Sequence, residues 1–222
     1  MRARRTIPAG SSAVASGAMA VERLDAWLAS PAVRTHHRRG AAAPPEALWD
    51  SAMRVRLDDT RSLGRLVRWR IPGLTSDLAY GELFRGDPFT VLEEDERLLI
   101  TGLCGRIWTL ARDYPRLAGP DDFRGWDEPG TVRVLLGHWV EEVGEGRAEL
   151  VSEARVQPVD RAAALRLRAL WTVIGRFERL VGAEPLALAA RDAERAGGAG
   201  RAGERHGGGE RHGGAGERQR RM

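Results

Sequence analysis

The chain has 222 residues, enough for one domain with terminal extensions or for two very small domains. All 35 basic residues are arginine, against 31 acidic residues, and the formal net charge is +4. The surplus lies at the ends, because residues 1–20 carry three Arg and no acid and residues 195–222 carry seven Arg and three Glu. Residues 21–194 hold 25 Arg and 28 acidic residues, which argues against nucleic-acid binding by the folded part.

The cysteine content and the apolar runs restrict the class of protein further. A single cysteine, Cys104, excludes an internal disulfide and a cysteine zinc site, and its apolar surroundings predict a small core residue. No apolar run approaches about 18 residues, so no membrane span is expected. The Arg-rich start lacks the apolar stretch of a secretory signal, which predicts a cytoplasmic protein, and Met1 and Met19 are both candidate start residues.

The first third of the chain predicts one strand flanked by helices. Residues 1–20 show no periodicity and are expected to be a disordered extension, and residues 21–29 predict a short helix. Residues 33–42 predict a strand. Pro44-Pro45 then opens a helix, because proline at the first helical position loses no hydrogen bond. A second short helix is expected over residues 60–69, and the apolar stripes of the two helices contain Leu48, Trp49, Ala52, Leu63, Leu66 and Val67.

The middle of the chain predicts antiparallel strands. Residues 80–84 are expected to be a strand, and residues 89–103 (FTVLEEDERLLITGL) a hairpin with its turn at Glu94-Asp95. That turn pairs Val91 with Leu98. The second strand is expected to reach about Thr109, and a long irregular crossing, LARDYPRLAGPDDFRGWDEPG, follows it. Loops of this length are often functional, so the crossing is a candidate lid.

A second hairpin, TVRVLLGHWVEEV and RAELVSEARVQPV, follows the crossing with a turn at residues 144–146. A three-residue loop that ends in glycine suits a type I turn followed by a left-handed residue, here Gly146. This loop pairs residues whose numbers sum to 290. One face is then apolar except for His138 and Ser152, and the other carries Arg133, Glu149, Glu153, Arg155 and Gln157. A one-residue slip would oppose apolar and charged positions, so the register is well specified.

The last predicted element is a long amphipathic helix. Asp160 is expected to cap it, and Pro185 to kink or interrupt it near residue 181, after which it runs to about Glu194. Its expected buried stripe contains Leu167, Leu170, Ile174, Phe177 and Val181. Residues 195–222 repeat GERHGG and are expected to be a disordered tail outside a domain of residues 21–194.

The order of these elements resembles the START-like or SRPBCC superfamily, including its uncharacterised bacterial members, over residues 33–193. The segments that carry the resemblance are APPEALWD, DFRGWDEPGTVRV, LVSEARVQPVD and RALWTVIGRFERLV. The resemblance implies an α+β helix-grip fold, in which a curved antiparallel sheet surrounds a long C-terminal helix and leaves a cavity. Members bind lipids, sterols, polyketides or plant hormones, and some are cyclases or ring hydroxylases, so the fold does not settle the function.

A ring-hydroxylase iron site needs two histidines and one carboxylate. The globular part offers only His36, His37 and His138, without the helical spacing of such a site. We therefore expect no metal and no cofactor.

The best candidate site residue is His138, opposite Ser152 and beside Leu136 and Ala154 in the predicted hairpin. A histidine there binds a ligand oxygen or acts as an acid or base; the alternative is a core histidine satisfied by Ser152 or by a backbone carbonyl. Arg106 shares the parity of Leu98, Ile100 and Cys104, so it either lies at the cavity mouth, where it would bind a carboxylate or phosphate, or is an ordinary surface arginine.

Aromatic residues supply the remaining candidates. Trp49, Trp108 and Trp171 fall where core or cavity walls are expected, and Tyr114 lies in the candidate lid. Trp139, with Leu135 and Val151, forms an apolar patch on the outer face of the hairpin. This patch is either a partner site or lies under the N-terminal segment.

Three functions remain open. The first is a module that holds a small apolar or amphipathic molecule, with His138, Ser152, Leu136, Ala154, Arg106, Trp108, Trp171 and Tyr114 as candidate ligand contacts. The second is a polyketide cyclase- or dehydratase-like enzyme that uses His138 as acid or base, with Arg106 or Tyr114 as a second polar group. The third is a protein-interaction module that docks through the Trp139 patch. The ligand and the oligomeric state are not predicted.

Overall fold

The computed structural model describes residues 10–61, 63–65, 75, 77–109 and 113–206, with the backbone alone for residues 10–16, 173–174, 176–181 and 199–206. Five antiparallel strands form one sheet in the order β1-β5-β4-β3-β2. The strands are β1 (Val33–Ala41), β2 (Thr90–Asp95), β3 (Leu98–Gly105), β4 (Val132–Gly144) and β5 (Arg147–Pro158). The helices are α1 (Gly10–Leu28), α2 (Pro45–Arg54), the 3-10 helix η1 (Leu57–Asp59), α4 (Tyr80–Arg85), α5 (Pro120–Arg124) and α6 (Arg161–His206).

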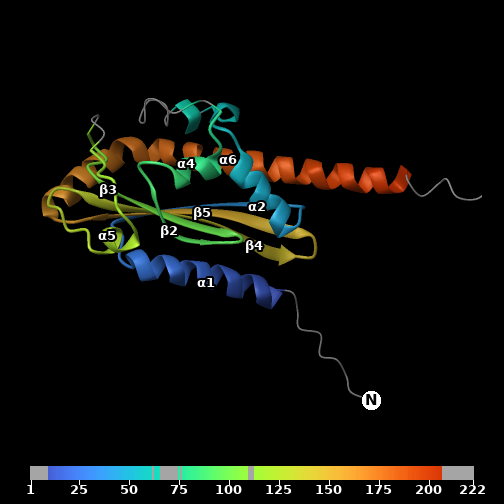
Figure 1. Ribbon diagram of the computed structural model, residues 1–222, viewed down its shortest axis with the longest axis horizontal. Helices are drawn as coiled ribbons and strands as arrows, with labels where there is room; N and C mark the ends of the chain where they lie inside the picture. Colours follow the sequence, from blue (N-terminus) through green and yellow to red (C-terminus); the bar gives the residue numbers. More distant parts are fainter. Residues whose placement is uncertain (1–9, 62, 66–74, 76, 110–112, 207–222) are drawn as a thin grey trace, which may run out of the picture.

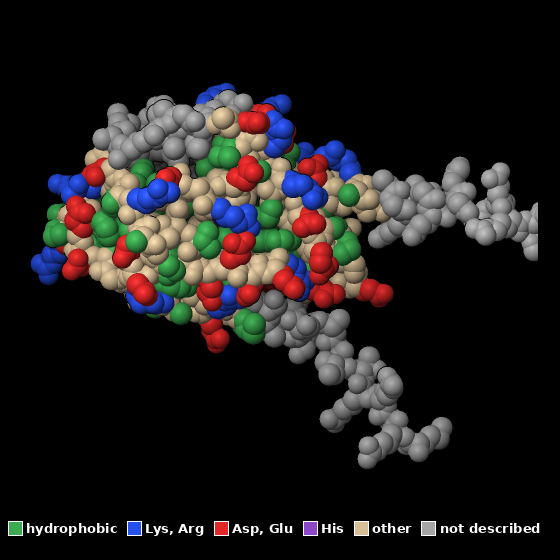
Figure 2. Space-filling model, in the orientation of Figure 1, with side chains coloured by type: hydrophobic (Ala, Val, Ile, Leu, Met, Phe, Trp, Pro, Cys, Tyr) green, Lys and Arg blue, Asp and Glu red, His purple; other side chains and the backbone are tan. Residues whose placement is uncertain are grey.

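Helices cover both faces of this sheet (Figure 1). The long C-terminal helix α6 lies on one face together with α2 and α4, and α1 lies on the other. We call these the α6 face and the α1 face. An open antiparallel sheet packed against a long C-terminal helix confirms the predicted α+β class and is consistent with a helix-grip fold. On the surface shown in Figure 2, acidic and basic side chains are interspersed. No helix in the described ranges has the length and apolar character needed to cross a membrane.

The hairpin of β4 and β5 has the predicted register. Val134 pairs with Val156, His138 with Ser152 and Val140 with Leu150, and the ladder shifts only between Glu142 and Gly144, next to the turn. Gly146 has a φ of 63°, as a turn of this length requires. Because the register holds along the ladder, Leu136, His138 and Val140 lie on the α6 face, and Leu135 and Trp139 lie on the α1 face.

The predicted register of the other hairpin is wrong. Asp95 pairs with Leu98 and Glu93 with Ile100, so the turn lies at Glu96-Arg97 instead of Glu94-Asp95, with a bulge between Val91 and Glu93. This register places two carboxylates on the α1 face. Arg23 of α1 binds both, donating from Nε to Glu93 Oε1 at 2.9 Å and pairing with Asp95. These ion pairs join β2 to a helix that is distant in the sequence, and a local apolar pattern does not reveal such contacts. Strand β3 also ends at Gly105, before Thr109.

Residues 80–84 form the start of helix α4, not the predicted strand. The Glu82 carboxylate accepts the backbone N–H of Ala79 at 3.3 Å, an interaction typical of a helix start. Tyr80, Leu83 and Phe84 are all buried, and the spacing i, i+3, i+4 places them on one helical face. Burial of that face against the sheet favours the helix.

The apolar patch on the outer face of the hairpin is covered by the N-terminal segment, the second of the two predicted alternatives, and it is not an exposed docking surface. Trp139, Val151 and Leu135 are at most 2% exposed and pack against Leu24 and Leu28 of α1. The approach is close, since a Cβ on Gly137 would lie 2.8 Å from a methyl group of Leu24. Helix α1 begins at Gly10, well before the predicted start at residue 21, while residues 1–9 lie outside the described part.

A buried ion network on the α1 face anchors the end of α1. Arg155, which is inaccessible to solvent, donates to Glu153 Oε1 at 2.6 Å, to Asp25 Oδ1 at 2.5 Å and to the Leu28 carbonyl at 2.9 Å. Burial raises the pKa of Glu153, but hydrogen bonds from Arg34, Arg155 and His36 outweigh this and leave the pKa below its ordinary value. Breaking one member of such a pair leaves a buried charge without its partner, so the network specifies where α1 sits.

Helix α6 differs from its prediction in length. Asp160 caps it as expected, because Asp160 Oδ1 accepts the Ala163 N–H at 2.7 Å. The helix is continuous through Pro185 and extends past Glu194 to His206, and it buries Leu186, Ala189 and Ala193 in one core cluster with α2. Leu167 is buried as predicted and Leu170 partly so. The side chains of Ile174, Phe177 and Val181 lie outside the described part, as do residues 62 and 66–69 of the expected helix over residues 60–69, of which residues 63–65 are helical.

The substitution Leu24→Ala tests whether α1 is an integral layer of the fold. Leu24 is fully buried over Gly137, so its truncation leaves a cavity, and we expect a loss of about 3 kcal/mol in the free energy of unfolding. Met19→Ala, in the same helix but 60% exposed, is the control and is expected to change stability by less than about 0.5 kcal/mol. Urea unfolding measures both, and equal midpoints for the two variants would contradict the arrangement.

Candidate functional site

The middle of the α6 face is packed less completely than its two ends. At one end Val134 and Val156 join a cluster with Leu167, and at the other Val140 and Leu150 join the large cluster that includes α2 and α6. Between these ends, five positions are only partly buried: Leu136, Ser152 and Ala154 of the hairpin and Thr35 and His37 of β1. Small and polar side chains therefore occupy the centre of a face whose ends are closed by bulky apolar ones.

His138 lies within this central region and is only 2% exposed. Helix α4 covers it, with the Phe84 ring centroid 4.6 Å and the Tyr80 ring centroid 5.1 Å from that of the imidazole. The Tyr80 hydroxyl lies 3.4 Å from His138 Nδ1. Ser152, opposite His138 in the ladder, hydrogen-bonds to the same hydroxyl; burial raises the pKa of Tyr80, and this bond partly offsets the increase. The three side chains form the chain Ser152, Tyr80, His138.

Burial alone lowers the pKa of His138 to about 3. The imidazole is therefore neutral at pH 7. A general acid or base works best when its pKa is near the working pH, so this histidine is poorly suited to proton transfer. It remains well suited to hydrogen bonding, because a neutral imidazole offers one donor and one acceptor.

Two buried polar atoms of this face have no hydrogen-bond partner among the described residues. They are His138 Nε2 and Thr101 Oγ1. Thr101 pairs with Leu136, and its neighbour Leu99 pairs with His138, so the two atoms come from diagonal positions of adjacent strands. Native proteins leave few buried polar atoms unpaired, and each one calls for a partner such as a water or a ligand.

The predicted second polar groups do not converge on His138. Arg106 follows β3 and binds carboxylates instead, Asp113 Oδ2 at 2.6 Å and Glu128 Oε1 at 3.1 Å. The parity it shares with Ile100 and Cys104 belongs to the α1 face. Tyr114 lies beside Gly105, where a Cβ would be 3.1 Å from its ring. Both residues thus lie at the far end of β3.

The predicted tryptophans lie in separate places. Trp49 is in the main core and is 7% exposed. Trp108 packs against the cluster of Val132, Val156 and Leu167 at one end of the α6 face, with the Arg166 guanidinium 5.9 Å from its ring centroid. Trp171 is partly buried on α6, where a Cβ on Gly175 would lie 3.2 Å from its indole nitrogen. Trp108 adjoins the central region through Val134.

Tyr80 and Thr101 are the members of the cluster that the sequence did not reveal. The sequence pattern predicts a strand at Tyr80, but Glu82 three residues after Ala79 indicates the start of a helix. Thr101 lies in an apolar stretch of the sequence, and no neighbouring residue indicates that it belongs to a site. Within the described ranges, no group of three or more His, Cys, Asp or Glu side chains is placed to hold a metal ion.

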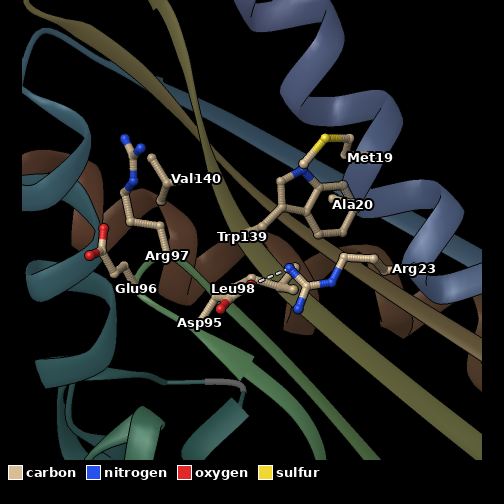
Figure 3. Close-up of a pocket in the computed structure, with 9 residues that line it drawn as sticks. All are labelled: Met19, Ala20, Arg23, Asp95, Glu96, Arg97, Leu98, Trp139 and Val140. Atoms are coloured by element: carbon tan, nitrogen blue, oxygen red, sulfur yellow. Dashed lines mark hydrogen bonds and ion pairs between the residues drawn. The ribbon is translucent and has the colours of Figure 1, made fainter.

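A separate cleft of about 350 Å³ opens at the edge of the α1 face, between α1 and the β2–β3 turn (Figure 3). Met19, Leu98 and Trp139 contribute apolar walls, and the charged side chains around it are Arg23, Asp95, Glu96 and Arg97. Arg23 pairs with Asp95, and Arg97 lies 3.4 Å from Glu46. Both arginines of this cleft are thus already paired with protein carboxylates.

Comparison with known proteins adds little to the geometry. No protein-family model and no curated protein matches the sequence. Among solved structures, hypothetical protein jhp0584 from Helicobacter pylori aligns with a TM-score of 0.33 and 8% identity, covering 87% of this chain and 99% of that one. TTHA0849 from Thermus thermophilus aligns at 0.29 and 11% identity, covering 74% and 99%, and Ara h 8.0201 at 0.21 and 10%, covering 68% and 95%. These scores are low, so the fold class rests on the topology itself.

The pKa of His138 predicts a specific acid sensitivity. An unfolded histidine binds a proton below about pH 6.5, whereas His138 stays neutral in the folded protein down to about pH 3. The stability present above pH 6.5 is therefore lost as the pH falls, by roughly 2 kcal/mol between pH 6.5 and 5. Urea unfolding of His138→Gln at both pH values is expected to lack this loss.

His36→Gln is the control, because His36 lies on the α1 face beside Glu153 at 3.1 Å. We expect this variant not to reduce the pH slope. If His138→Gln and the wild type lost equal stability on acidification, His138 would not be a buried neutral histidine.

Proposed function

We propose that this chain is a binding module that holds a small apolar or amphipathic molecule on the α6 face without transforming it. The observation that carries the proposal is the central region, where Leu136, Ser152 and Ala154 stay partly buried between two buried clusters. Ligand sites in proteins are mostly apolar with a few polar groups that fix orientation. The buried cluster of His138, Tyr80 and Thr101 supplies such groups beside an apolar floor.

The other two candidate functions have less support. An enzyme that uses His138 as acid or base would need a pKa closer to neutrality and a second polar group nearby, and Arg106 and Tyr114 lie elsewhere. Docking through Trp139 would require α1 to leave the sheet. Membership of the START-like superfamily and a cytoplasmic location belong to the proposal as expectations from the sequence.

The proposal is tested with the neutral fluorescent probe N-phenyl-1-naphthylamine. We expect saturable binding at one site in the wild type and a loss of at least about tenfold in affinity in Ala154→Trp, because the indole fills the central region. Ala162→Trp is the matched control, since Ala162 is exposed on α6, and its affinity is expected to equal that of the wild type.

Ala154→Leu is a milder variant for the case in which Ala154→Trp does not fold. Thermal unfolding of each variant without probe identifies any loss of structure. Absence of saturable binding in the wild type, or equal loss in the Ala154 and Ala162 variants, would overturn the proposal.

A further inference from the structure

We propose that the bound molecule is anchored through an uncharged acceptor oxygen, as in a ketone, ester or hydroxyl, that accepts a hydrogen bond from His138 Nε2. This inference rests on the proposed function and specifies the chemistry of its ligand. It is built on the chain Ser152, Tyr80, His138, on the unpaired Nε2 and Thr101 Oγ1, and on the burial of His138 without a charged partner among the described residues.

We assign the imidazole proton to Nε2, with the Ser152 hydroxyl donating to Tyr80 and the Tyr80 hydroxyl donating to His138 Nδ1. A phenolic oxygen that accepts from the Ser152 hydroxyl has its own hydrogen left to donate. The nearest partner for that hydrogen is His138 Nδ1, 3.4 Å from the Tyr80 hydroxyl. A neutral imidazole that accepts at Nδ1 carries its hydrogen at Nε2. With this assignment His138 Nε2 is a donor, held in place by two side chains from β5 and α4.

This donor is buried without a protein acceptor among the described residues, and Thr101 Oγ1 is a second unpaired polar atom on the same face. Diagonal positions on neighbouring antiparallel strands have Cβ atoms about 7 Å apart, so one oxygen between the side chains can meet both. An oxygen with two lone pairs accepts from both groups. A carbonyl or ether-type oxygen fits this pair of donors, whereas a ligand group that only donates leaves Nε2 unsatisfied.

The surroundings favour an uncharged oxygen. Burial lowers the pKa of His138, and among the described residues no charged side chain contributes to the shift. Arg34, Glu153 and Arg155 belong to the network on the α1 face. On the α6 face, Arg39 is exposed on edge strand β1 and His37 is opposite Ser152. A carboxylate beside a buried neutral imidazole would lack a counter-charge, which is costly.

Three naphthalenes of similar shape test the inference by displacement of N-phenyl-1-naphthylamine. They are 2-acetylnaphthalene, which has a neutral acceptor, 2-isopropylnaphthalene, which has none, and 2-naphthoate, which is charged. The readout is the ratio of the ketone's affinity to the hydrocarbon's affinity. We expect His138→Phe to lower this ratio about tenfold through loss of one buried hydrogen bond, with the hydrocarbon's affinity little changed. Thr101→Val is expected to lower it by a smaller factor.

The outcomes separate the inference from the proposed function. If both neutral probes bind and Ala154→Trp excludes them, but His138→Phe leaves the ratio unchanged, Nε2 donates to an internal water only and the inference is overturned while the binding function stands. If 2-naphthoate binds more tightly than the ketone and depends on His138, the anchor is charged and the inference is likewise overturned. If no probe binds the wild type, the proposed function itself fails.

A direct measurement covers the case in which His138→Phe does not fold. In the ¹H–¹⁵N spectrum of the wild type, the Nε2–H resonance of His138 is expected to move downfield when 2-acetylnaphthalene is added and to stay in place with 2-isopropylnaphthalene. An unchanged resonance with a bound ketone would overturn the inference.

Discussion

The pairing of β4 with β5 is the constraint on which the rest of the structure depends. With His138 opposite Ser152, every second residue of the hairpin faces α6 and the others face α1. A slip of one residue would exchange the two sets and bring Trp139 and Arg155 to the face where α6 packs. The register thus places the apolar and ionic side chains that bind α1 on one face of the sheet. On the other face it places the central region with its buried histidine.

The two faces reach stability by different means. On the α1 face, apolar packing of Leu24 against Trp139 is combined with the ion network of Glu153 and Arg155, which pairs the buried charges but leaves Arg155 Nη2 without a hydrogen-bond partner among the described residues. On the α6 face, the hydrogen-bonding capacity of the buried His138 is satisfied only in part, because Nδ1 has a partner and Nε2 has none among the described residues. Unpaired buried polar groups are rare in folded proteins, and the α6 face holds two of them, His138 Nε2 and Thr101 Oγ1, on neighbouring strands, so this face calls for a further binding partner.

Much of this architecture could be predicted from the sequence, and the reasons for the remainder are physical. The β4–β5 hairpin combines a short turn with an alternating pattern, so local information sets its register and places His138 beside Ser152. The register of the β2–β3 hairpin includes a bulge between Val91 and Glu93 and contacts to Arg23, which is distant in the sequence, and the alternating pattern predicts neither. Coverage of Trp139 likewise depends on α1, although a cover formed by the N-terminal segment was one of the two alternatives considered.

The candidate site was likewise predicted only in the part that local strand pairing defines. The strand pairing identified His138, Ser152, Leu136 and Ala154, because they belong to one local hairpin. Tyr80 and Thr101 reach the site through the packing of α4 and through β3, and no local pattern distinguishes them. Arg106 was uncertain because the parity of β3 allowed either face, and its bonds to Asp113 and Glu128 settle its place.

The central claim is that the α6 face holds a small neutral molecule. Native mass spectrometry of the full chain, purified from the cells that naturally produce it, tests this claim most directly. The account predicts a mass addition of one small molecule per chain, lost on denaturation, with the released compound neutral and carrying an acceptor oxygen. Protein of bare mass that also gains no mass in the presence of 2-acetylnaphthalene would contradict it.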